Sequence, residues 1–435
     1  MTRMTRMTLV EWLAYIERQH PRSIEMGLER VRQVAASLGL GRPARRVVTV
    51  GGTNGKGSTV AFIRAIAEAA GLSVHAYTSP HLVRFNERIR LGGRLIEDAA
   101  LNALLDRIEA VMAEQDIEAT VFESTTAAAF VAMSETPADL AIVEVGLGGV
   151  LDATNVIERP LLSVIAPVDL DHAEFLGTSL RGVAVEKAGI LKAGARGLIA
   201  RQHEAAMAAI EVGAQAVRAP LTVMGVDFDA WSERGVLAFQ DQGRFLDLPA
   251  PALPGPHQIA NAGLAVAVAL ELDLPERAIA NGLRTVLWPA RMQRLTAGPY
   301  AEAARAADAE LWLDGGHNPH AARALAEALA ERQARAPRPL ALVVGMLGNK
   351  DAGGFFEALK DSGATVFTVP FEGAAAEPEA LAAVARGHGL GATACASATE
   401  ALERALRLGA GRVVICGSLY LAGEVLGASR ETWPD

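Results

Sequence analysis

The sequence is poor in cysteine: its 435 residues include only two, Cys395 and Cys416. Because the two stand in no metal-like spacing, we expect no disulfide framework and a reducing compartment. No stretch of about 18 uncharged apolar residues occurs, so we expect no membrane-spanning helix. Charged residues at Glu11, Glu17 and Arg18 interrupt the only candidate for the apolar part of a signal peptide. The sequence therefore predicts a cytoplasmic protein.

Basic residues are also in deficit. The chain has 41 Lys and Arg against 50 Asp and Glu, a net charge of −9. This balance argues against nucleic-acid binding, although a local basic pocket for an anionic small molecule remains open. The composition, 51% hydrophobic and 21% charged, is that of a globular protein. Since a single core rarely grows past about 250–300 residues, we expect two domains.

Apolar, strand-like runs alternate with helical stretches in the first part of the chain. Residues 47–50 form a predicted strand, and a Gly-rich turn and a helix from about Ser58 to Ala70 follow. Residues 140–145 and 161–165 are further apolar runs. Such runs with helices between them are typical of buried strands in a mainly parallel sheet. The segment 220–250 alternates differently and predicts a small antiparallel addition.

A Pro-rich stretch at residues 251–256 breaks the chain before a helix expected at about 261–270. Residues 287–291 then resemble a linker. Beyond the linker the rhythm resumes, with strands predicted at 311–313, 340–344 and 412–416 and helices from Pro319 and after Ser418. We therefore expect two α/β domains, residues 1–288 and residues 289–435.

The strongest motif is the turn at residues 51–59, GGTNGKGST. It lies between a predicted strand and a predicted helix, as a phosphate-binding loop does. Glycines let backbone N–H groups converge on phosphate oxygens, and the helix N-terminus adds partial positive charge. Lys56 is placed to reach the β- and γ-phosphates, and Ser58 to bind Mg²⁺. Val50 and Gly57 depart from the standard spacing; the alternative is a Gly-rich surface turn with one lysine.

Three further features bring acids, a histidine and a lysine to the ends of strands. Glu144 closes an apolar run, Asp171 and His172 follow another, and Lys187 lies in the stretch EKAGI. In open parallel sheets ligands bind outside the carboxyl ends of the strands. Taken singly, Glu144 could be a helix cap, His172 a loop histidine and Lys187 a surface lysine. Together with the phosphate loop they favour one site for a nucleotide and a metal.

In order along the chain, these residues resemble the folylpolyglutamate synthase family, a branch of the Mur ligase superfamily. The resemblance covers nearly the whole chain and is carried by GLER (27–30), the phosphate loop, SPHL (79–82), FNERI (85–89), EVGLGGVLDATN (144–155), Asp171-His172, EKAGI (186–190), DGGHNPH (314–320) and GMLGNKD (345–351). It implies a P-loop NTPase-like Mur ligase central domain, followed by a smaller Rossmann-like α/β domain that acts as the glutamate ligase domain.

The resemblance also implies roles for single residues. Those implied to be catalytic are Lys56, Glu144, His172 and Lys187, of which Lys187 matches a lysine that is carbamylated. The implied ligands of two Mg²⁺ ions are Ser58, Ser79, Glu144 and His172. The implied ATP contacts are Gly52, Thr53, Asn54, Gly55, Lys56, Gly57, Ser58, Thr59, Asn261, Arg291, Asp314 and His317. The implied contacts to the pterin or folate substrate are Gly27, Leu28, Glu29, Arg30, Thr120, Phe122, Asp152 and Ala153.

The implied activity is the ATP-dependent addition of L-glutamate to 7,8-dihydropteroate and to folates through an acyl phosphate, by a monomer. The open alternative is a folylpolyglutamate synthase that does not accept dihydropteroate, and Phe122 is as compatible with a core position as with stacking on a pterin. A ligase of cell-wall precursors would need a UDP-binding domain ahead of the phosphate loop, for which residues 1–50 are too few. A P-loop switch protein would not need Asp314 and His317.

Three positions depart from the family pattern. Val150 replaces a common arginine, Gly316 a frequent alanine and Ala290 a frequent glycine. The last two exchange one small residue for another and are expected to be tolerated, whereas any anion contact of the arginine is lost at Val150.

Overall fold

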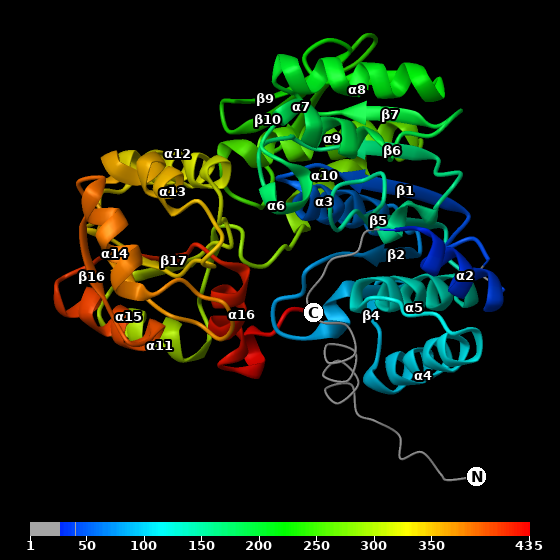
Figure 1. Cartoon of the computed structure of the whole chain (residues 1–435). Helices are drawn as coiled ribbons and strands as arrows, with labels where there is room; N and C mark the ends of the chain where they lie inside the picture. Colours follow the sequence, from blue (N-terminus) through cyan, green and yellow to red (C-terminus); the bar gives the residue numbers. More distant parts are fainter. Residues whose placement is uncertain (1–26, 40) are drawn as a thin grey trace. The chain divides into compact units, whose positions relative to one another are not determined.

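The computed structural model describes residues 27–39 and 41–435 (Figure 1). They form two compact units, each built from separate segments of the chain. The first unit contains the described residues up to Pro80, Asn86–Pro249 and Asn261–Thr285, and the second contains His81–Phe85, Ala250–Ala260 and Val286–Asp435. The predicted boundary at residue 288 treats each domain as one continuous segment and stays a prediction.

An eight-stranded sheet forms the centre of the first unit. Its strands lie in the order β4 (Arg94–Leu95), β3 (Ile89–Leu91), β2 (Val74–Tyr77), β5 (Leu140–Glu144), β1 (Arg46–Gly51), β6 (Leu162–Ile165), β7 (Arg196–Ile199) and β8 (Leu221–Val223). All neighbouring pairs from β2 to β8 are parallel, and β3 and β4 add antiparallel pairs at one edge. The apolar runs predicted as buried strands are β1, β5 and β6.

Helices cover this sheet. They are α2 (Glu29–Ser37), α3 (Lys56–Ala69), α4 (Asp98–Gln115), α5 (Val121–Glu135), α6 (Ala173–Leu176), α7 (Leu180–Ala188), α8 (Glu204–Val217), α9 (Pro256–Glu271) and α10 (Glu276–Thr285), with short 3₁₀ turns η1 (Phe85–Arg88) and η2 (Ala153–Val156). Helix α3 packs on β1, β2 and β5, and α10 packs on α3. Because a Cβ at Gly282 would lie 2.5 Å from the Ile66 backbone, α10 approaches α3 at a distance that only glycine permits.

Two predictions about element boundaries need correction. The antiparallel addition is present as β9 (Phe228–Glu233), β10 (Val236–Asp241) and β11 (Phe245–Pro249), but β8 pairs in parallel with β7 and belongs to the main sheet. Helix α9 begins at Pro256, about five residues before its predicted start. Proline lacks the N–H that the first turn of a helix leaves unpaired, so it can open a helix as well as break one.

The second unit is built on a six-stranded sheet of order β12 (Gln293–Arg294), β13 (Glu310–Leu313), β17 (Arg412–Cys416), β14 (Leu340–Val344), β15 (Thr365–Thr368) and β16 (Gly391–Ala394). Only β12 is antiparallel to its neighbour. The helices are α11 (Gly298–Ala306), α12 (Pro319–Arg335), α13 (Ala352–Leu359), α14 (Pro378–Gly387), α15 (Ala398–Arg407) and α16 (Leu419–Gly427), with 3₁₀ turns η3 (Lys360–Ser362) and η4 (Arg430–Thr432).

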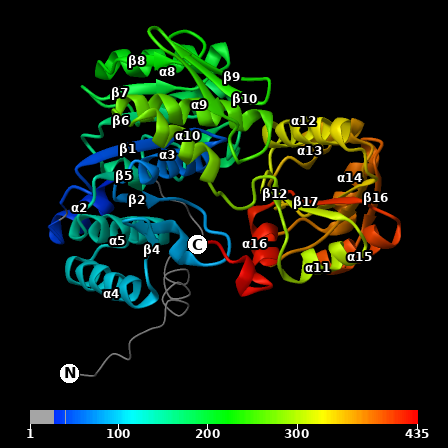
Figure 2. The same ribbon diagram turned by 180° about the vertical axis from the view of Figure 1, so that it is seen from behind.

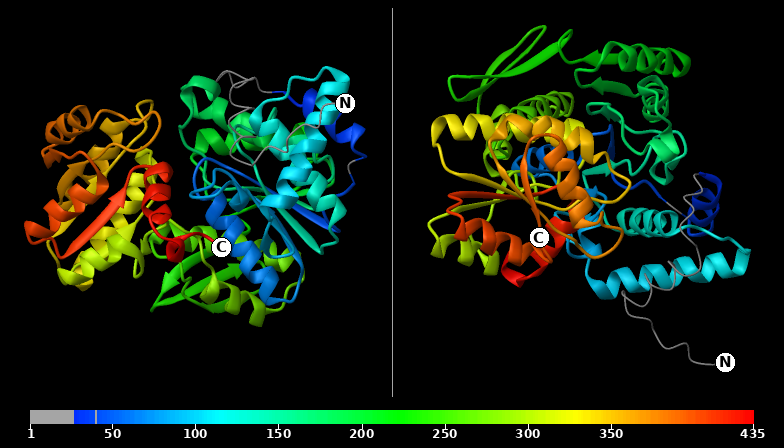
Figure 3. Two further views of the ribbon diagram at one scale, coloured as in Figure 1. Left: turned by 90° about the horizontal axis from the view of Figure 1, so that it is seen from below. Right: turned by 60° about the vertical axis from the view of Figure 1, so that its left-hand side comes forward.

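Both faces of this second sheet are covered (Figure 2; Figure 3 shows it in yellow to red from two other sides). Alternate residues of β13 show why: Leu311 and Leu313 pack with α11, α15 and α16, whereas Trp312 packs with α12 and α13. A strand buried on both faces has a continuous apolar run, which is how β13, β14 and β17 were predicted. No helix in the described part of the chain is long and apolar enough to cross a membrane.

Candidate active site

The phosphate loop connects the carboxyl end of β1 to the start of α3. Gly52 and Gly55 have φ angles of 135° and 81°, in the region that favours glycine. The backbone N–H groups of Thr53 and Asn54 donate to the Pro167 carbonyl at 2.9 and 3.2 Å. The Thr53 hydroxyl donates to the Asp169 carbonyl at 2.8 Å and accepts from the Asp169 N–H at 3.0 Å. The segment that follows β6 therefore fixes the shape of the loop.

The loop is closely surrounded. A Cβ at Gly52 would lie 2.8 Å from the Ala166 Cβ, and a Cβ at Gly55 would lie 2.4 Å from Asn261 Oδ1. Asn261 comes from α9 and is buried, so two segments about 200 residues apart in sequence meet at Gly55. The structure thus brings Asn261, a predicted nucleotide contact, to the phosphate loop.

The residues at the start of α3 that are predicted to bind phosphate and metal have different environments. Lys56 is the first residue of α3, and its Nζ donates to the Thr53 carbonyl at 3.2 Å. Ser58 and Thr59 are buried and Gly57 is buried with them. The lysine therefore folds back over the loop, whereas Ser58 is buried in the first turn of α3.

Glu144 is the last residue of β5, where it is paired in register with Val50 of β1. Its side chain is 5% exposed, and Oε2 accepts a hydrogen bond of 3.2 Å from the backbone N–H of Ser79, just beyond β2. Glu144 follows a strand and caps no helix. The structure therefore brings Ser79 and Glu144 together at the carboxyl ends of neighbouring strands, and we call them the Ser79–Glu144 pair.

Lys187 lies in the last turn of α7 and is 5% exposed, so the alternative of a surface lysine is wrong. Its Nζ donates to the Gly52 carbonyl at 2.9 Å and so ties α7 to the phosphate loop. Burial, and to a lesser extent the nearby positive charge of Lys56, lower the pKa of Lys187 to about 7 against an opposing effect of Asp171. A large fraction of this amine is therefore neutral at neutral pH.

The glycines of the 144–155 motif allow its loop to pack on α7. A Cβ at Gly149 would lie 2.3 Å from the Glu186 carbonyl oxygen, and a Cβ at Gly189 would lie 2.4 Å from Val150 Cγ2. The Asn155 amide donates to the Val150 and Gly189 carbonyls at 3.1 and 3.2 Å. These motif residues hold the loop against the EKAGI stretch, and the side chain of Val150 is exposed.

His172 is exposed and has a φ of 52°, and its N–H donates to Asp171 Oδ1 at 2.8 Å. Within residues 27–39 and 41–435, no group of three or more His, Cys, Asp and Glu side chains is arranged to hold a metal. The predicted set has a different make-up, with two hydroxyls, one carboxylate and one imidazole. Its hydroxyl and carboxylate oxygens are donors that Mg²⁺ accepts, so the chemistry of these residues fits the ion.

On the predicted substrate side, Thr120 is the N-cap of α5. Its hydroxyl accepts from the Glu123 N–H at 3.2 Å, and Glu123 Oε2 accepts from the Thr120 N–H at 2.8 Å, which completes a capping box. Glu123 is buried, and Arg30 Nε lies 3.1 and 3.0 Å from its two oxygens. Gly27, Leu28 and Glu29 precede Arg30 at the start of α2.

Phe122 and Asp152 flank the loop that follows β5. A Cβ at Gly146 would lie 2.4 Å from Phe122 Cζ, and the Phe122 ring centroid lies 6.4 Å from that of Tyr77. Asp152 accepts from the Leu147 N–H at 2.7 Å and the Thr154 N–H at 3.0 Å, and both it and Ala153 are buried. Burial raises the pKa of Asp152. Phe122 is half-buried, which leaves part of the ring accessible.

The predicted residues of the second unit gather at the carboxyl end of β13. Asp314 accepts from the Met292 N–H at 2.9 Å and the Gly316 N–H at 2.8 Å. A Cβ at Gly315 would lie 3.0 Å from an Arg291 guanidinium nitrogen, and His317 Nδ1 lies 3.1 Å from the Gly315 carbonyl. Arg291, Asp314 and His317 thus lie around one turn.

Comparisons with known proteins agree with this arrangement. A family model described as "Mur ligase, glutamate ligase domain" matches residues 293–419. The dihydrofolate synthase/folylpolyglutamate synthase of Escherichia coli (strain K12) is 34% identical over 96% of this chain and 94% of its own. The folylpolyglutamate synthase of Lacticaseibacillus casei is also 34% identical, over 96% and 98%.

A solved structure is similar over the whole length. The bifunctional folylpolyglutamate synthase/dihydrofolate synthase of Yersinia pestis, complexed with AMPPNP and a Mn ion, is 34% identical, covers 98% of this chain and 99% of its own, and gives a TM-score of 0.86. The chain belongs to the dihydrofolate synthase/folylpolyglutamate synthase family. The predicted family and fold class are confirmed, and this family of Mur ligases consists of ATP-dependent ligases.

The surroundings of two positions that depart from the family pattern, Ala290 and Gly316, can be described from the structure. Ala290 has a φ of 54°, in the left-handed region, which accounts for the glycine that is frequent there. Gly316 is closely surrounded, because a Cβ there would lie 2.8 Å from Asp314 Oδ1.

The structure adds two residues that the sequence reasoning on this synthase missed. His257, before the predicted start of α9, lies near the charges of Asp314 and Arg291, and burial lowers its pKa to about 4. Its Nδ1 is buried and has no hydrogen-bond partner among the described residues. Glu123 joins Thr120 to Arg30. The spacing of Thr120 and Glu123 is the sequence signature of a capping box and could have revealed this acid.

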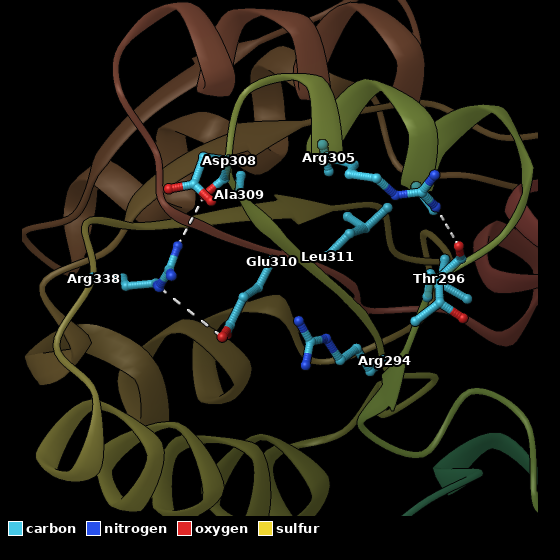
Figure 4. Close-up of a pocket in the computed structure, with 11 residues that line it drawn as sticks. Arg294, Thr296, Arg305, Asp308, Ala309, Glu310, Leu311 and Arg338 are labelled. Carbon is cyan, nitrogen blue, oxygen red and sulfur yellow. Dashed lines mark hydrogen bonds and ion pairs between the residues drawn. The ribbon is translucent and has the colours of Figure 1, made fainter.

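A cavity of about 190 Å³ in the second unit lies away from these residues (Figure 4). Glu310 on its wall begins β13, whereas Asp314 follows the end of that strand, so the two lie at opposite ends. Glu310 Oε2 accepts from the buried Arg412 Nε at 2.8 Å, and Arg338 Nε lies 4.0 Å from Glu310 Oε1. Because these charges already compensate one another, we assign the cavity no ligand.

Proposed function

We propose that this chain is a bifunctional ligase that uses ATP to add L-glutamate to 7,8-dihydropteroate and to folates. One observation carries the proposal: the phosphate loop, Glu144 and Lys187 meet at the carboxyl ends of β1 and β5, with Lys187 bonded to Gly52 at 2.9 Å. Full-length similarity to enzymes of this family supports the reaction class.

The proposed reaction has two steps. The substrate carboxylate attacks the γ-phosphorus of ATP, which forms an acyl phosphate and releases ADP. The amine of L-glutamate then attacks the acyl carbon, an amide bond forms, and inorganic phosphate leaves. In the first step Lys56 and the backbone N–H groups of residues 55–58 bind the phosphates, and Asn261 holds the loop at Gly55.

Ser58, Ser79, Glu144 and His172 would hold two Mg²⁺ ions, which supply charge neutralisation during phosphoryl transfer. A divalent ion is supported by the AMPPNP and Mn complex of the Yersinia pestis relative. The Ser79 N–H fixes the orientation of the Glu144 carboxylate, and the hydroxyl of Ser58 is placed by the first turn of α3.

We further propose that Lys187 reacts with CO₂. The neutral amine attacks the carbon of CO₂, a C–N bond forms, and one proton is released, which leaves a carbamate anion. A pKa of about 7 supports this step, because an amine with the usual value of 10.5 would be almost entirely protonated. The carbamate would exchange a positive charge beside Gly52 for a negative one that attracts a cation.

The substrate side is proposed to lie along the loop after β5. Phe122 would stack on the pterin, Asp152, Ala153 and Thr120 would contact it, and Gly27, Leu28, Glu29 and Arg30 would border it. The half-exposed ring of Phe122 and the buried carboxylate of Asp152 support this placement. A folylpolyglutamate synthase without dihydropteroate activity is the second candidate, and the Lacticaseibacillus casei relative carries that name.

Arg291, Asp314 and His317 of the second unit are proposed to contact the nucleotide. The proposed domains are residues 1–288, which bind ATP and the pterin or folate, and residues 289–435, the glutamate ligase domain. The buried free thiols of Cys395 and Cys416 favour the cytoplasm. We propose a monomer that binds small molecules and neither nucleic acid nor membrane, and the net charge of −9 supports the part of this proposal that concerns nucleic acid.

The test is phosphate release from ATP with Mg²⁺ and L-glutamate, measured with dihydropteroate, with a tetrahydrofolate, and with neither. We expect release with each acceptor and little without one. Release with the folate but not with dihydropteroate would identify the protein as a folylpolyglutamate synthase, the second candidate. Release without any acceptor would indicate an ATPase and contradict the proposal.

A matched pair of variants ties this release to the phosphate loop. Gly55 and Gly71 have φ angles of 81° and 84°, but a Cβ at Gly55 meets Asn261 whereas one at Gly71 meets nothing within 4 Å. Alanine at either position carries a backbone cost of about 1–2 kcal/mol. We expect Gly55→Ala to abolish phosphate release and Gly71→Ala to retain it. Equal activities would remove the loop from the proposed site.

A further inference from the structure

Five residues, His81–Phe85, leave the first unit and pack with the second, and we call them the strap. The chain before the strap, up to Pro80, and after it, from Asn86, belongs to the first unit. Ser79 of the Ser79–Glu144 pair stands two residues before the strap. A displacement of the strap is therefore transmitted to Ser79 through only two peptide bonds.

Helix α16 holds the middle of the strap. Leu82 and Val83 pack against the core cluster of the second unit that contains Leu421 and Val425. A Cβ at Gly423 would lie 2.1 Å from the Leu82 carbonyl oxygen, so the backbone of the strap lies directly on this helix. Only glycine at position 423 permits so close an approach.

The segment after α16, residues 429–434, holds the end of the strap, and we call it the tail. The Arg84 guanidinium lies 5.1 Å from the centroid of the Trp433 ring, within the range of a cation–π contact, and donates to the Pro434 carbonyl at 3.2 Å. Arg430 lies 5.3 Å from the same ring. The indole N–H of Trp433 donates to the Gly427 carbonyl at 3.4 Å, which ties the ring to the end of α16.

Residues on the two sides of the strap are hydrogen-bonded to each other in the first unit, and we call these bonds the base of the strap. The Thr78 N–H donates to the Arg88 carbonyl at 3.0 Å, and its hydroxyl donates to the Glu87 carbonyl at 3.3 Å. Ser79 lies between this base and the strap, and its N–H holds Glu144 Oε2. The orientation of the Glu144 carboxylate thus depends on a residue that is fixed on both sides.

We propose that Arg84 and Trp433 are positioning residues for the Ser79–Glu144 pair: the tail holds the strap, and the strap sets the Ser79 N–H that orients Glu144. The inference rests on the proposed role of this pair in holding Mg²⁺. Residues that orient metal ligands typically change metal affinity or activity by about 10–100-fold when removed. Because neither residue is a ligand, the expected change is at the lower end.

The test is the concentration of free Mg²⁺ that gives half-maximal phosphate release at saturating ATP, folate and L-glutamate. We expect Trp433→Ala and Arg84→Gln each to raise this concentration about tenfold. Trp433→Phe keeps an aromatic ring under Arg84, so its Mg²⁺ requirement should stay close to that of the wild type. Arg430→Ala is the matched control, since Arg430 contacts the same ring without touching the strap, and should stay within about twofold of the wild type. The KM for L-glutamate, a readout independent of the pair, should change less than the Mg²⁺ requirement in all four variants.

Ser79→Ala separates the two possible failures. If this variant leaves the Mg²⁺ requirement unchanged, the proposed role of the pair in metal binding is wrong. If it raises the requirement while Trp433→Ala and Arg84→Gln do not, the pair holds metal and the positioning inference is overturned. A change in Arg430→Ala as large as that in Arg84→Gln would also overturn it, because the effect would then not depend on the contact between Arg84 of the strap and the tail. Should Trp433→Ala fail to fold, the Mg²⁺ requirements of Arg84→Gln and Trp433→Phe decide whether the positioning inference holds.

Discussion

Lys187 connects two properties of the site, because the burial that lowers its pKa to about 7 also makes it a nucleophile. Between pH 7 and 10.5 the unfolded chain binds a proton at this side chain that the folded protein has lost. Stability therefore rises with pH across this window, and the cost of burying a cation is largest below pH 7. Carbamylation would remove this cost by replacing the cation.

We predict that Lys187→Met, compared with the wild type in bicarbonate-free buffer, gains most stability at pH 6. The gain should shrink by on the order of 2 kcal/mol between pH 7 and pH 9, as the wild-type amine becomes neutral. Thermal unfolding of both proteins at several pH values measures the difference. A difference that stays constant across this range would mean that Lys187 keeps its ordinary pKa in the folded protein.

Residues of the site were predictable where a local pattern carries the chemistry. The loop at 51–59 and Glu144 at the end of a strand are such cases, and the structure brings Lys187 of α7 into contact with the loop. The depressed pKa of Lys187 was not predictable, since it depends first on burial in the folded protein and then on Lys56, which is 131 positions away in sequence. The family resemblance implied that Asn261 contacts the nucleotide, and no local pattern would place it beside Gly55, where the structure has it.

At the scale of elements, α5 shows how one helix start serves both folding and the proposed substrate site. Thr120 caps the helix, and Glu123 completes the capping box and binds Arg30 of α2. The capping box therefore joins two of the stretches proposed to border the substrate.

We predict that Thr120→Ala destabilises the protein by about 1 kcal/mol, the usual cost of losing an N-cap acceptor. A loss of this size lowers the melting temperature by about 2–4 °C in units of this size. Thr120→Ser keeps the acceptor oxygen and should unfold like the wild type. If Thr120 also contacts substrate, the KM for dihydropteroate will rise in the alanine variant; an alanine variant as stable as the wild type would show that the cap is dispensable.

Elements with continuous apolar runs were predicted well because buried parallel strands leave that signature. The strands β2 and β7 were not predicted, since polar or small residues such as His75 and Gly197 interrupt their apolar runs. His75 is buried because its ring nitrogens bond to the Thr136 carbonyl and the Gly92 N–H, partners that tertiary structure supplies. The start of α9 was misplaced because Pro256 reads equally as a helix breaker and as a first-turn residue.

At the scale of the whole molecule, the two units are not two successive halves of the chain. The second unit takes in His81–Phe85 and Ala250–Ala260, which sequence reasoning had assigned to the first domain. A segment that packs with the other unit carries no local sequence pattern that shows it. Apolar residues such as Leu82 and Val83 could be buried in either unit, and only their packing on α16 assigns them to the second.

This division predicts how the second unit behaves when it is cut from the chain. A fragment of residues 289–435 lacks Leu82, Val83 and His257, so it exposes the surface of α16 that the strap covers. Each large apolar side chain removed from a core position costs about 1.5–3 kcal/mol. We therefore expect the fragment to bind 1-anilinonaphthalene-8-sulfonate and to unfold at low urea concentration.

A peptide of residues 79–87, added in trans, should displace the dye from this fragment, because it restores the packing of Leu82 and Val83 on α16. The same peptide with Leu82→Asp and Val83→Asp is the matched control, since it keeps Arg84 but cannot fill an apolar surface. A fragment that folds without exposed apolar surface and ignores both peptides would support the continuous boundary at residue 288. Displacement by the native peptide alone would instead show that the strap is an integral part of the second unit's core, which is the condition for the tail to act on Ser79.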